Sequence, residues 1–288
     1  MLIRSEFTIE FQIPHPAAII AMLRLHPSLD RARLGPEYLR IEHIGWDFSR
    51  NIMGEEFNDG FGNRCTRFVA PQGGLRLTGS STVHNSGVGD LIKTEAIQHN
   101  IEDLPTDVLP YLLSSRYCPV DTLSQVAGEM FGHTSPGWAR AIWIRDWVHN
   151  AVQFDYAKAR PTKTALDVFT ERTGVCRDFQ HLAITMTRAM NIPARYVTGY
   201  LGDIRRPGNG SPGDFSAWYQ VFLDDQWWDM DARHNDGRLG RTLMATGRDA
   251  TDVAITTSFG AANLNYFYVK SFEVDEEGAP VPLPEIGS

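Results

Sequence analysis

Cys176 is the residue of this sequence best placed to carry out chemistry. It lies in the stretch ERTGVCRDFQHLAITMTRAM, residues 171–190, directly after a Gly-Val step and directly before a pattern of helical spacing. A cysteine at the start of a helix lies beside unpaired backbone N–H groups, which favour the thiolate and could also hold an oxyanion during acyl transfer. Most cysteines are instead small buried apolar residues, so its position alone leaves that alternative open.

Other charged or aromatic groups have simpler explanations than a binding site. The aspartates between residues 224 and 231 lack the Gly and the final Glu of a calcium-binding EF-hand, and a turn followed by a strand explains them. Trp218, Trp227 and Trp228 are expected to pack in a core. Several arginines could bind the carboxylate of an acyl donor, although ion pairs within the protein are the more common arrangement. These arginines are Arg177, Arg233, Arg238, Arg241 and Arg248. The sequence predicts no metal site and no cofactor.

Three segments together resemble bacterial transglutaminase-like proteins, which belong to the cysteine-protease superfamily with a papain-related core. They are TGVCRDFQHLAITMTRAMNIPARYVTGYL (173–201), FSAWYQVFLDDQWWDMDARHN (215–235) and GRDATDVAITTSFG (247–260), while NDGFGN (58–63) resembles the N-terminal β-domain of that family. The resemblance implies a triad of a Cys at a helix start, a His opening the next strand and an Asp ending the strand after it. Carried over, it makes Cys176 the nucleophile and Asp231 the orienting carboxylate. It also implies attack of a thiolate on an amide carbonyl, giving an acyl-enzyme that water or an amine resolves.

The sequence departs from this family at the position of the base. The family usually has Asp-Phe-His-Ala-Trp where this chain has DFSAW (214–218), so Ser216 stands at the His position. A two-residue hairpin loop at residues 224–225 would set the cross-strand register. The expected pairs are Leu223 with Gln226, Trp218 with Asp231, and Ser216 with Arg233. A serine is too short to reach its diagonal neighbour Asp231, and a neutral hydroxyl has no useful proton affinity near neutral pH.

Two other histidines near these motifs are alternative bases. His234 follows Asp231 by three residues, and a hairpin loop one residue longer would place it opposite Ser216, on the other face of the strand from Asp231. His181 lies five residues after Cys176, about 140° around the helix, and therefore points elsewhere. Of the two, His234 is the better candidate.

The composition indicates a protein with a sizeable core and an acidic surface. The chain has 288 residues, 42% of them hydrophobic, and a formal net charge of −8 without a cluster of Lys or Arg. We therefore do not expect nucleic acid or a membrane as a partner. The widely spaced Cys65, Cys118 and Cys176 are expected to form neither a disulfide framework nor a metal site, and the first residues show a strand pattern without a basic region ahead of an apolar core. The sequence thus predicts a cytoplasmic protein.

The order of the expected elements predicts an α+β protein with two domains. Short strands at 7–13, 38–44, 58–70 and 73–83, with one helix around Ala17–Leu25, predict a β-sandwich-like domain over residues 1–110. Helices at 137–152, 164–170 and after Cys176 precede strands at 194–201, 218–231 and 264–274, which predicts a transglutaminase-like core over residues 111–276. A Gly/Pro loop of the kind that forms lids is expected at 205–214, and a loose tail at 277–288.

Fold and motifs together predict a thiol-dependent hydrolase or acyl transferase. Its substrates would be peptides, proteins or small amides, and its activity would be impaired because Ser216 replaces the general base. The alternative is a non-catalytic pseudoenzyme that binds a peptide or protein partner in the same groove. The motifs do not distinguish hydrolysis from transamidation, and they do not identify the substrate or the oligomeric state.

Overall fold

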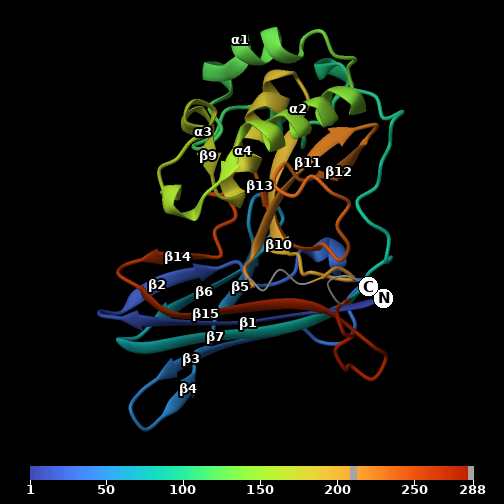
Figure 1. Ribbon diagram of the computed structural model, residues 1–288. Helices are drawn as coiled ribbons and strands as arrows, with labels where there is room; N and C mark the ends of the chain where they lie inside the picture. Colours follow the sequence, from blue (N-terminus) through green and yellow to red (C-terminus); the bar gives the residue numbers. More distant parts are fainter. Residues whose placement is uncertain (208–212, 285–288) are drawn as a thin grey trace.

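The computed structural model describes residues 1–207 and 213–284. A β-sandwich forms the lower part of the molecule, and a sheet covered by helices α1–α4 forms the upper part (Figure 1). Helices and mostly antiparallel sheets confirm the predicted α+β class. The central residues of the predicted Gly/Pro loop lie outside the described residues.

The sandwich consists of a five-stranded sheet and a four-stranded sheet. The first has the strand order β15-β1-β7-β3-β4, and the second has the order β14-β2-β6-β5. Buried and less buried side chains alternate along the strands, because successive side chains of a strand point to opposite faces. In β1 the buried ones are Ile3, Ser5, Phe7 and Ile9. The strands are β1 (Leu2–Ile13), β2 (Ala17–Ala21), β3 (Tyr38–Ile44), β4 (Ser49–Asn51), β5 (Glu55–Asn58), β6 (Arg64–Ala70), β7 (Gly73–His84), β14 (Thr256–Phe259) and β15 (Asn263–Val274).

Residues 17–21 form strand β2, so the helix predicted around Ala17–Leu25 is wrong. Ala17, Ile19 and Ala21 are buried while Ala18 is exposed, which is the alternation of a strand with one buried face. The strand pairs with β6 on one side and with β14 on the other. A short apolar run is ambiguous between helix and strand, and here pairing with distant segments decides the outcome.

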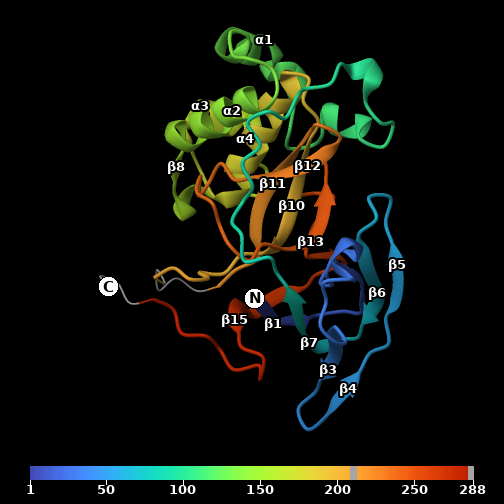
Figure 2. The same ribbon diagram turned by 90° about the vertical axis from the view of Figure 1, so that its right-hand side faces the viewer.

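The last strand of the chain lies in the sandwich and not in the core to which the sequence analysis assigned it. Strand β15 pairs along its length with β1, from Leu2 with Val274 to Gln12 with Asn263. Strand β14 likewise joins the sheet of β2. The chain therefore leaves the sandwich, builds the core and returns, and β15 passes beneath the core (Figures 1 and 2).

The core is an antiparallel sheet with helix α4 packed against it. The strand order is β12-β11-β10-β13, and α4 contacts β10 and β11 as well as helices α1, α2 and α3. Phe179, Ala183 and Met186 are buried, as the helical spacing predicted. The elements are α1 (Val120–Phe131), α2 (Trp138–Ala151), α3 (Ala165–Glu171), α4 (Cys176–Ala189), β8 (Gln153–Phe154), β9 (Thr173–Gly174), β10 (Ala194–Tyr200), β11 (Ser216–Leu223), β12 (Gln226–Met230) and β13 (Thr242–Gly247).

The core and the sandwich meet at the ends of β10 and β11. Tyr200 is the last residue of β10, Ile204 follows that strand, and Phe215 directly precedes β11. All three are buried in the hydrophobic cluster of the sandwich. Phe215 packs against Phe7 of β1, with ring centroids 5.9 Å apart. The N-terminal end of α4 thus lies at the junction between the two parts, where a cavity forms.

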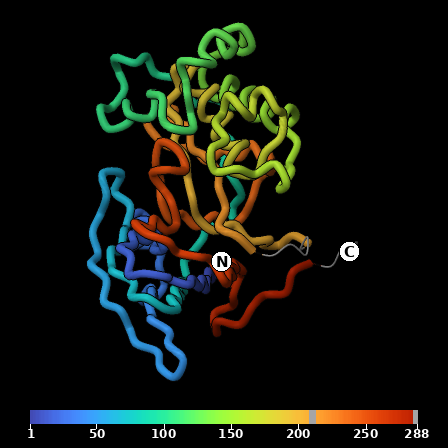
Figure 3. The backbone as a smooth tube through the Cα atoms, turned by 90° about the vertical axis from the view of Figure 1, so that its left-hand side faces the viewer, coloured from blue at the N-terminus to red at the C-terminus, as the bar shows by residue number. Residues whose placement is uncertain are grey.

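The described part of the C-terminal tail folds back toward this junction, although the sequence predicted a loose tail. The backbone N–H of Val281 donates to the carbonyl of Glu273 over 2.9 Å, and Pro280 forms a bridge with Val274. Figures 2 and 3 show the C-terminal segment and the segment after β10 extending from the same side of the molecule. Across residues 1–207 and 213–284, none of the helices is long and apolar enough to cross a membrane.

Candidate active site

Cys176 is the first residue of α4, as the sequence predicted. Val175 has the extended backbone of a cap, and its N–H donates to the carboxylate of Asp178 over 3.0 Å. The Gly of the Gly-Val step is needed for steric reasons, since a Cβ at position 174 would lie 2.6 Å from the Cβ of Asp178. The glycine therefore lets the chain pass close to the first helical turn and presents Cys176 at its start.

Two cavities meet at Cys176. The smaller has a volume of about 290 Å³ and the larger a volume of about 820 Å³. Both are lined by Cys176 and by the segment from Asp214 to Ala217, so the thiol lies at the boundary between them. A substrate that extends to both sides of its reacting carbonyl can therefore cross the thiol from one cavity into the other.

The thiol of Cys176 is held in its protonated form. Burial raises its pKa to about 11, and the nearby charge of Asp214 acts in the same direction. A hydrogen bond from the backbone N–H of Arg177 opposes this rise without cancelling it. The position at the helix start alone does not produce a thiolate, so attack on a carbonyl requires a group that removes the proton.

We expect slow alkylation of Cys176 by iodoacetamide near pH 7. With a pKa of about 11, roughly one thiol in 10⁴ is ionised at pH 7, and the rate should rise about tenfold per pH unit up to about pH 10. The measurement is the labelling rate of Cys176 from peptide mass spectrometry, with Cys176→Ala as the control. Rapid labelling that does not change between pH 5 and pH 7 would show instead that a cation stabilises the thiolate.

Asp231 lies just after β12 and accepts hydrogen bonds from several directions. Its Oδ1 accepts from the backbone N–H groups of Arg233 and His234 at 2.9 and 3.1 Å, and its Oδ2 accepts from Arg241 at 3.2 Å. Burial by itself would raise the pKa of Asp231, but the hydrogen bond from His234 and the charge of Arg241 hold it well below its ordinary value. Asp231 is therefore a carboxylate at every pH at which the protein would work.

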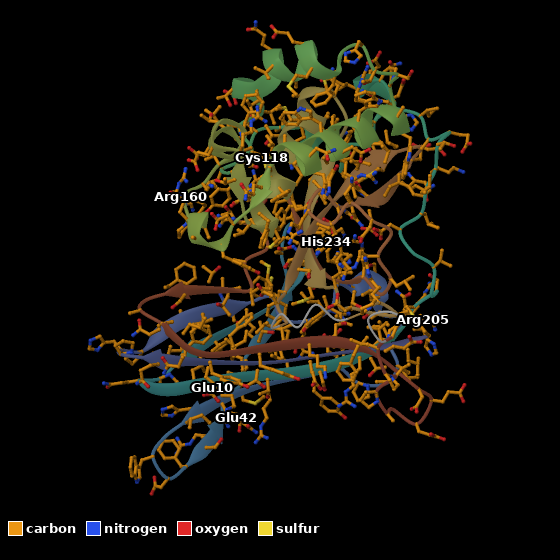
Figure 4. The ribbon with its side chains drawn as sticks, in the orientation of Figure 1. Glu10, Glu42, Cys118, Arg160, Arg205 and His234 are labelled. Atoms are coloured by element: carbon orange, nitrogen blue, oxygen red, sulfur yellow. The ribbon has the colours of Figure 1, made fainter. Side chains whose placement is uncertain are left out.

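His234 bonds directly to Asp231, which corrects the expectation that the two residues occupy opposite faces. The Nδ1 of His234 lies 3.0 Å from Oδ2 of Asp231, and the His234 side chain is 30% exposed. The strand β12 ends at Met230, and the turn that follows brings residue 234 back beside residue 231. His234 lines the larger cavity together with Cys176, and Figure 4 shows it where the core meets the sandwich.

Ser216 opens β11 and lines both cavities beside Cys176. The predicted hairpin loop is present, because Leu223 pairs with Gln226, and Asp224 and Asp225 have φ angles of 53° and 59°. Pairing between β11 and β12 ends at Tyr219 and Met230, however. The expected pairs of Trp218 with Asp231 and of Ser216 with Arg233 do not form, because the chain turns away after Met230. The strand partner of Ser216 is Gly199 of β10.

Gln180 is a site residue that the sequence analysis did not identify. It lies four residues after Cys176, and it is fully buried. Its Nε2 donates to the carbonyl of Ala217 at 3.2 Å and to Oδ1 of Asp231 at 3.1 Å, while its Oε1 accepts from the N–H of Ala232 at 3.3 Å. One side chain therefore ties the helix of Cys176 to β11 and to the turn that follows β12. The spacing of four residues, which places Gln180 above Cys176 on one helix face, was the available signal.

Arg241 links this site to the segment that joins the sandwich to the core. Its Nε and Nη2 each donate to the carboxylate of Asp90 over 2.7 Å, and Nη2 also reaches Asp231. The guanidinium is nearly buried and lies over the ring of Trp218. The carboxylate of Asp231 is thus hydrogen-bonded to both Arg241 and His234.

The remaining candidates have structural roles. His181 is buried, and its Nε2 accepts the N–H of Ala250 at 3.1 Å. Asp229 accepts hydrogen bonds from Trp218 Nε1 at 2.7 Å and from Gln220 Nε2 at 2.8 Å. Within the described ranges, the structure holds no group of three or more His, Cys, Asp or Glu side chains arranged to bind a metal ion.

Comparison with known proteins shows what this chain is similar to. Residues 124–232 match the model of the Transglutaminase-like superfamily. A crystal structure of a candidate cysteine protease from Cytophaga hutchinsonii superposes with a TM-score of 0.81 at 29% identity, over 99% of this chain and 94% of that protein. An uncharacterized protein of Mycobacterium leprae is 29% identical over 208 residues, which are 68% of this chain and 73% of the relative. Residues 124–232, with Cys176 at the start of a helix packed on the antiparallel sheet, thus form a domain similar to the transglutaminase-like superfamily.

Proposed function

We propose that this protein catalyses thiol-dependent acyl transfer or hydrolysis on peptide or amide substrates, with Cys176 as nucleophile and His234 as base. One observation carries the proposal. The imidazole of His234 is bonded through Nδ1 to the buried carboxylate of Asp231, and the same imidazole lines the cavity that contains Cys176. A carboxylate that binds one ring nitrogen orients the imidazole and stabilises its protonated form, which is the task of the third member of a triad. His234 thereby supplies the group that is missing at Ser216.

The reaction follows from these positions. With Nδ1 bonded to Asp231, the Nε2 atom of His234 accepts the proton of the Cys176 thiol as the sulfur attacks the carbonyl carbon of the substrate. The oxyanion of the tetrahedral intermediate accepts hydrogen bonds from backbone N–H groups at the start of α4. When the C–N bond breaks, the leaving amine takes the proton from His234 and leaves a thioester on Cys176. Water or a second amine then attacks the thioester while His234 accepts its proton, and the C–S bond breaks as His234 returns that proton to the sulfur of Cys176.

A specific observation also favours the non-catalytic alternative. Burial and Asp214 raise the pKa of Cys176 to about 11, and Ser216 occupies the position where the family has its base. A protein that retained the two cavities but lost the chemistry would bind a peptide or protein partner across Cys176. In that case the thiol would be part of the cavity wall and would remain unmodified after binding.

Trapping the acyl-enzyme tests the two functions against each other. The wild-type protein and Cys176→Ala are mixed with an activated peptide thioester, and the intact masses are recorded over time. We expect a mass increase equal to one acyl group on the wild-type protein only, with Cys176 as the modified residue in the digest. Binding of the thioester to both proteins without an adduct on Cys176 would support the pseudoenzyme and contradict acyl transfer.

A further inference from the structure

The two cavities beside Cys176 differ in their chemistry. Beyond the shared residues, the smaller cavity is lined largely by apolar side chains, among them Val253, Ile255 and Phe267. The larger cavity has charged side chains among its apolar ones. The cations Arg233, Arg238 and Lys270 and the carboxylate of Asp203 line this cavity only, while Asp214 lines both. A substrate that crosses the thiol therefore meets a largely apolar lining on one side and a lining with several additional charged side chains on the other.

Arg233 differs from the other arginines of the sequence motifs because its charge is not paired. Within residues 1–207 and 213–284, the structure gives its guanidinium no carboxylate partner and no hydrogen bond. The other arginines that the sequence nominated for substrate binding are held by carboxylates. The pairs are Arg177 with Asp178, Arg238 with Asp203, Arg241 with Asp90 and Asp231, and Arg248 with Asp252. In this group of described arginines, Arg233 alone lines the larger cavity with an unneutralised guanidinium.

The position of Arg233 is well defined although its charge is free. Its backbone N–H donates to Asp231, and its guanidinium carbon lies 4.0 Å from the centre of the Phe154 ring. Phe154 is in turn packed edge-on against Tyr156, with ring centroids 4.8 Å apart, and both rings line the same cavity. Stacking on one face leaves the N–H groups at the edge of the guanidinium free to donate, in the fork geometry that matches a carboxylate.

The location of His234 assigns a role to each cavity. His234 and Arg233 line the larger cavity and are not among the residues that line the smaller one. Because the base must return its proton to the leaving amine, the leaving group has to lie on the side of His234. The acyl part of the substrate then occupies the smaller, apolar cavity.

We infer that Arg233 forms an anion subsite which binds a carboxylate on the leaving amine, so that the preferred leaving group is an amino acid or peptide that carries a free carboxylate. The inference rests on the proposed function for the direction of the substrate. Lys270 adds a second cation to the same cavity and lies over the ring of Phe272. Asp214 adds a carboxylate, whose pKa is raised by burial and which also lines the smaller cavity. The carboxylate of the leaving group could be a terminal α-carboxylate or the side chain of Asp or Glu.

Matched peptide pairs test the subsite and separate these two sources. One pair is Ala-Ala-Ala with a free or an amidated C-terminus, and the other is Ala-Ala-Glu-amide with Ala-Ala-Gln-amide. Binding is measured by calorimetry with Cys176→Ala protein, and turnover is measured with the wild-type protein. We expect the anionic member of at least one pair to bind about tenfold more tightly, since hydrogen bonds to charged groups are stronger than neutral ones. The pair that shows the difference identifies which carboxylate is bound.

If the subsite is correct, the preference for anionic peptides depends on the charge of Arg233. In the Cys176→Ala background, Arg233→Met should remove the difference, Arg233→Lys should keep part of it, and Arg248→Met should keep all of it. Thermal unfolding of each variant verifies that the fold is retained. Equal binding of both members of each pair, or binding of neither, overturns the subsite. Turnover of neutral peptides without a preference for anionic ones would support the proposed function and reject the subsite. Selective binding of the anionic peptides without formation of an acyl-enzyme would support the subsite and reject the proposed function.

Discussion

Replacement of His234 by glutamine is expected to lower kcat for amide hydrolysis by a factor of about 10² to 10⁴, the usual contribution of a positioned general base. Glutamine can keep a hydrogen bond to Asp231 through its amide, but it cannot accept the proton of the Cys176 thiol near neutral pH. The loss should therefore appear in kcat, with the affinity for substrate largely retained. Initial rates with a chromogenic peptide amide, measured over a range of substrate concentrations, separate the two parameters.

A control variant shows whether the effect belongs to this histidine. His133 is exposed and packs beside Trp143, away from both cavities, so His133→Gln should leave kcat unchanged. Equal activity of His234→Gln and the wild-type protein would mean that His234 is not the base. If the wild-type activity still depended on Cys176, another residue would then have to remove the proton.

The second large effect concerns Ser216, which the sequence resemblance aligns with the histidine of the family. In the His234→Gln background, Ser216→His should restore turnover by roughly 10²-fold, at the lower end of what a general base contributes. Residue 216 lines both cavities with Cys176, and the neighbouring Ala217 is tied through Gln180 to Asp231, so an imidazole there has the thiol and the carboxylate near it. The measurement is kcat of the double variant relative to His234→Gln, with the further change Cys176→Ala as the background control.

The same substitution in the wild-type protein distinguishes the catalytic function from the pseudoenzyme alternative. If His234 is the base, Ser216→His alone should change kcat much less than it does in the His234→Gln background, because the site already has an imidazole. A large gain from Ser216→His alone, with no loss from His234→Gln, would indicate that the natural protein lacks a base. The pseudoenzyme alternative would then describe the protein better.

Local patterns in the sequence were sufficient for the elements around the nucleophile. The Gly-Val step and the helical spacing after it predicted the helix that begins at Cys176, and the structure confirms it. The two aspartates of the hairpin likewise predicted the loop, because positive φ angles at both positions are needed and Asp tolerates them. These features depend on neighbours a few residues away, and such interactions can be read along the chain.

The placement of β2 and β15 could not be derived in the same way. The apolar run at residues 17–21 fits a helix or a strand, and only pairing with β6 and β14 selects the strand. Strand β15 was recognised as a strand but assigned to the core, whereas it pairs with β1 at the other end of the chain. Strand partners this far apart in the sequence are selected by complementary faces in three dimensions, and periodicity along one segment contains no information about them.

The sequence by itself indicated the resemblance to the transglutaminase-like superfamily, selected Cys176 as the candidate nucleophile and placed a serine at position 216, because each of these depends on a residue type within a motif. Only the tertiary structure decided the relation of His234 to Asp231. Extending the hairpin register past Met230 separates the two side chains, but the strand ends there and the turn joins them through a hydrogen bond of 3.0 Å. The buried carboxylate needs donors: the turn after it supplies two backbone N–H groups and His234, and Gln180 and Arg241 reach it from other segments of the chain.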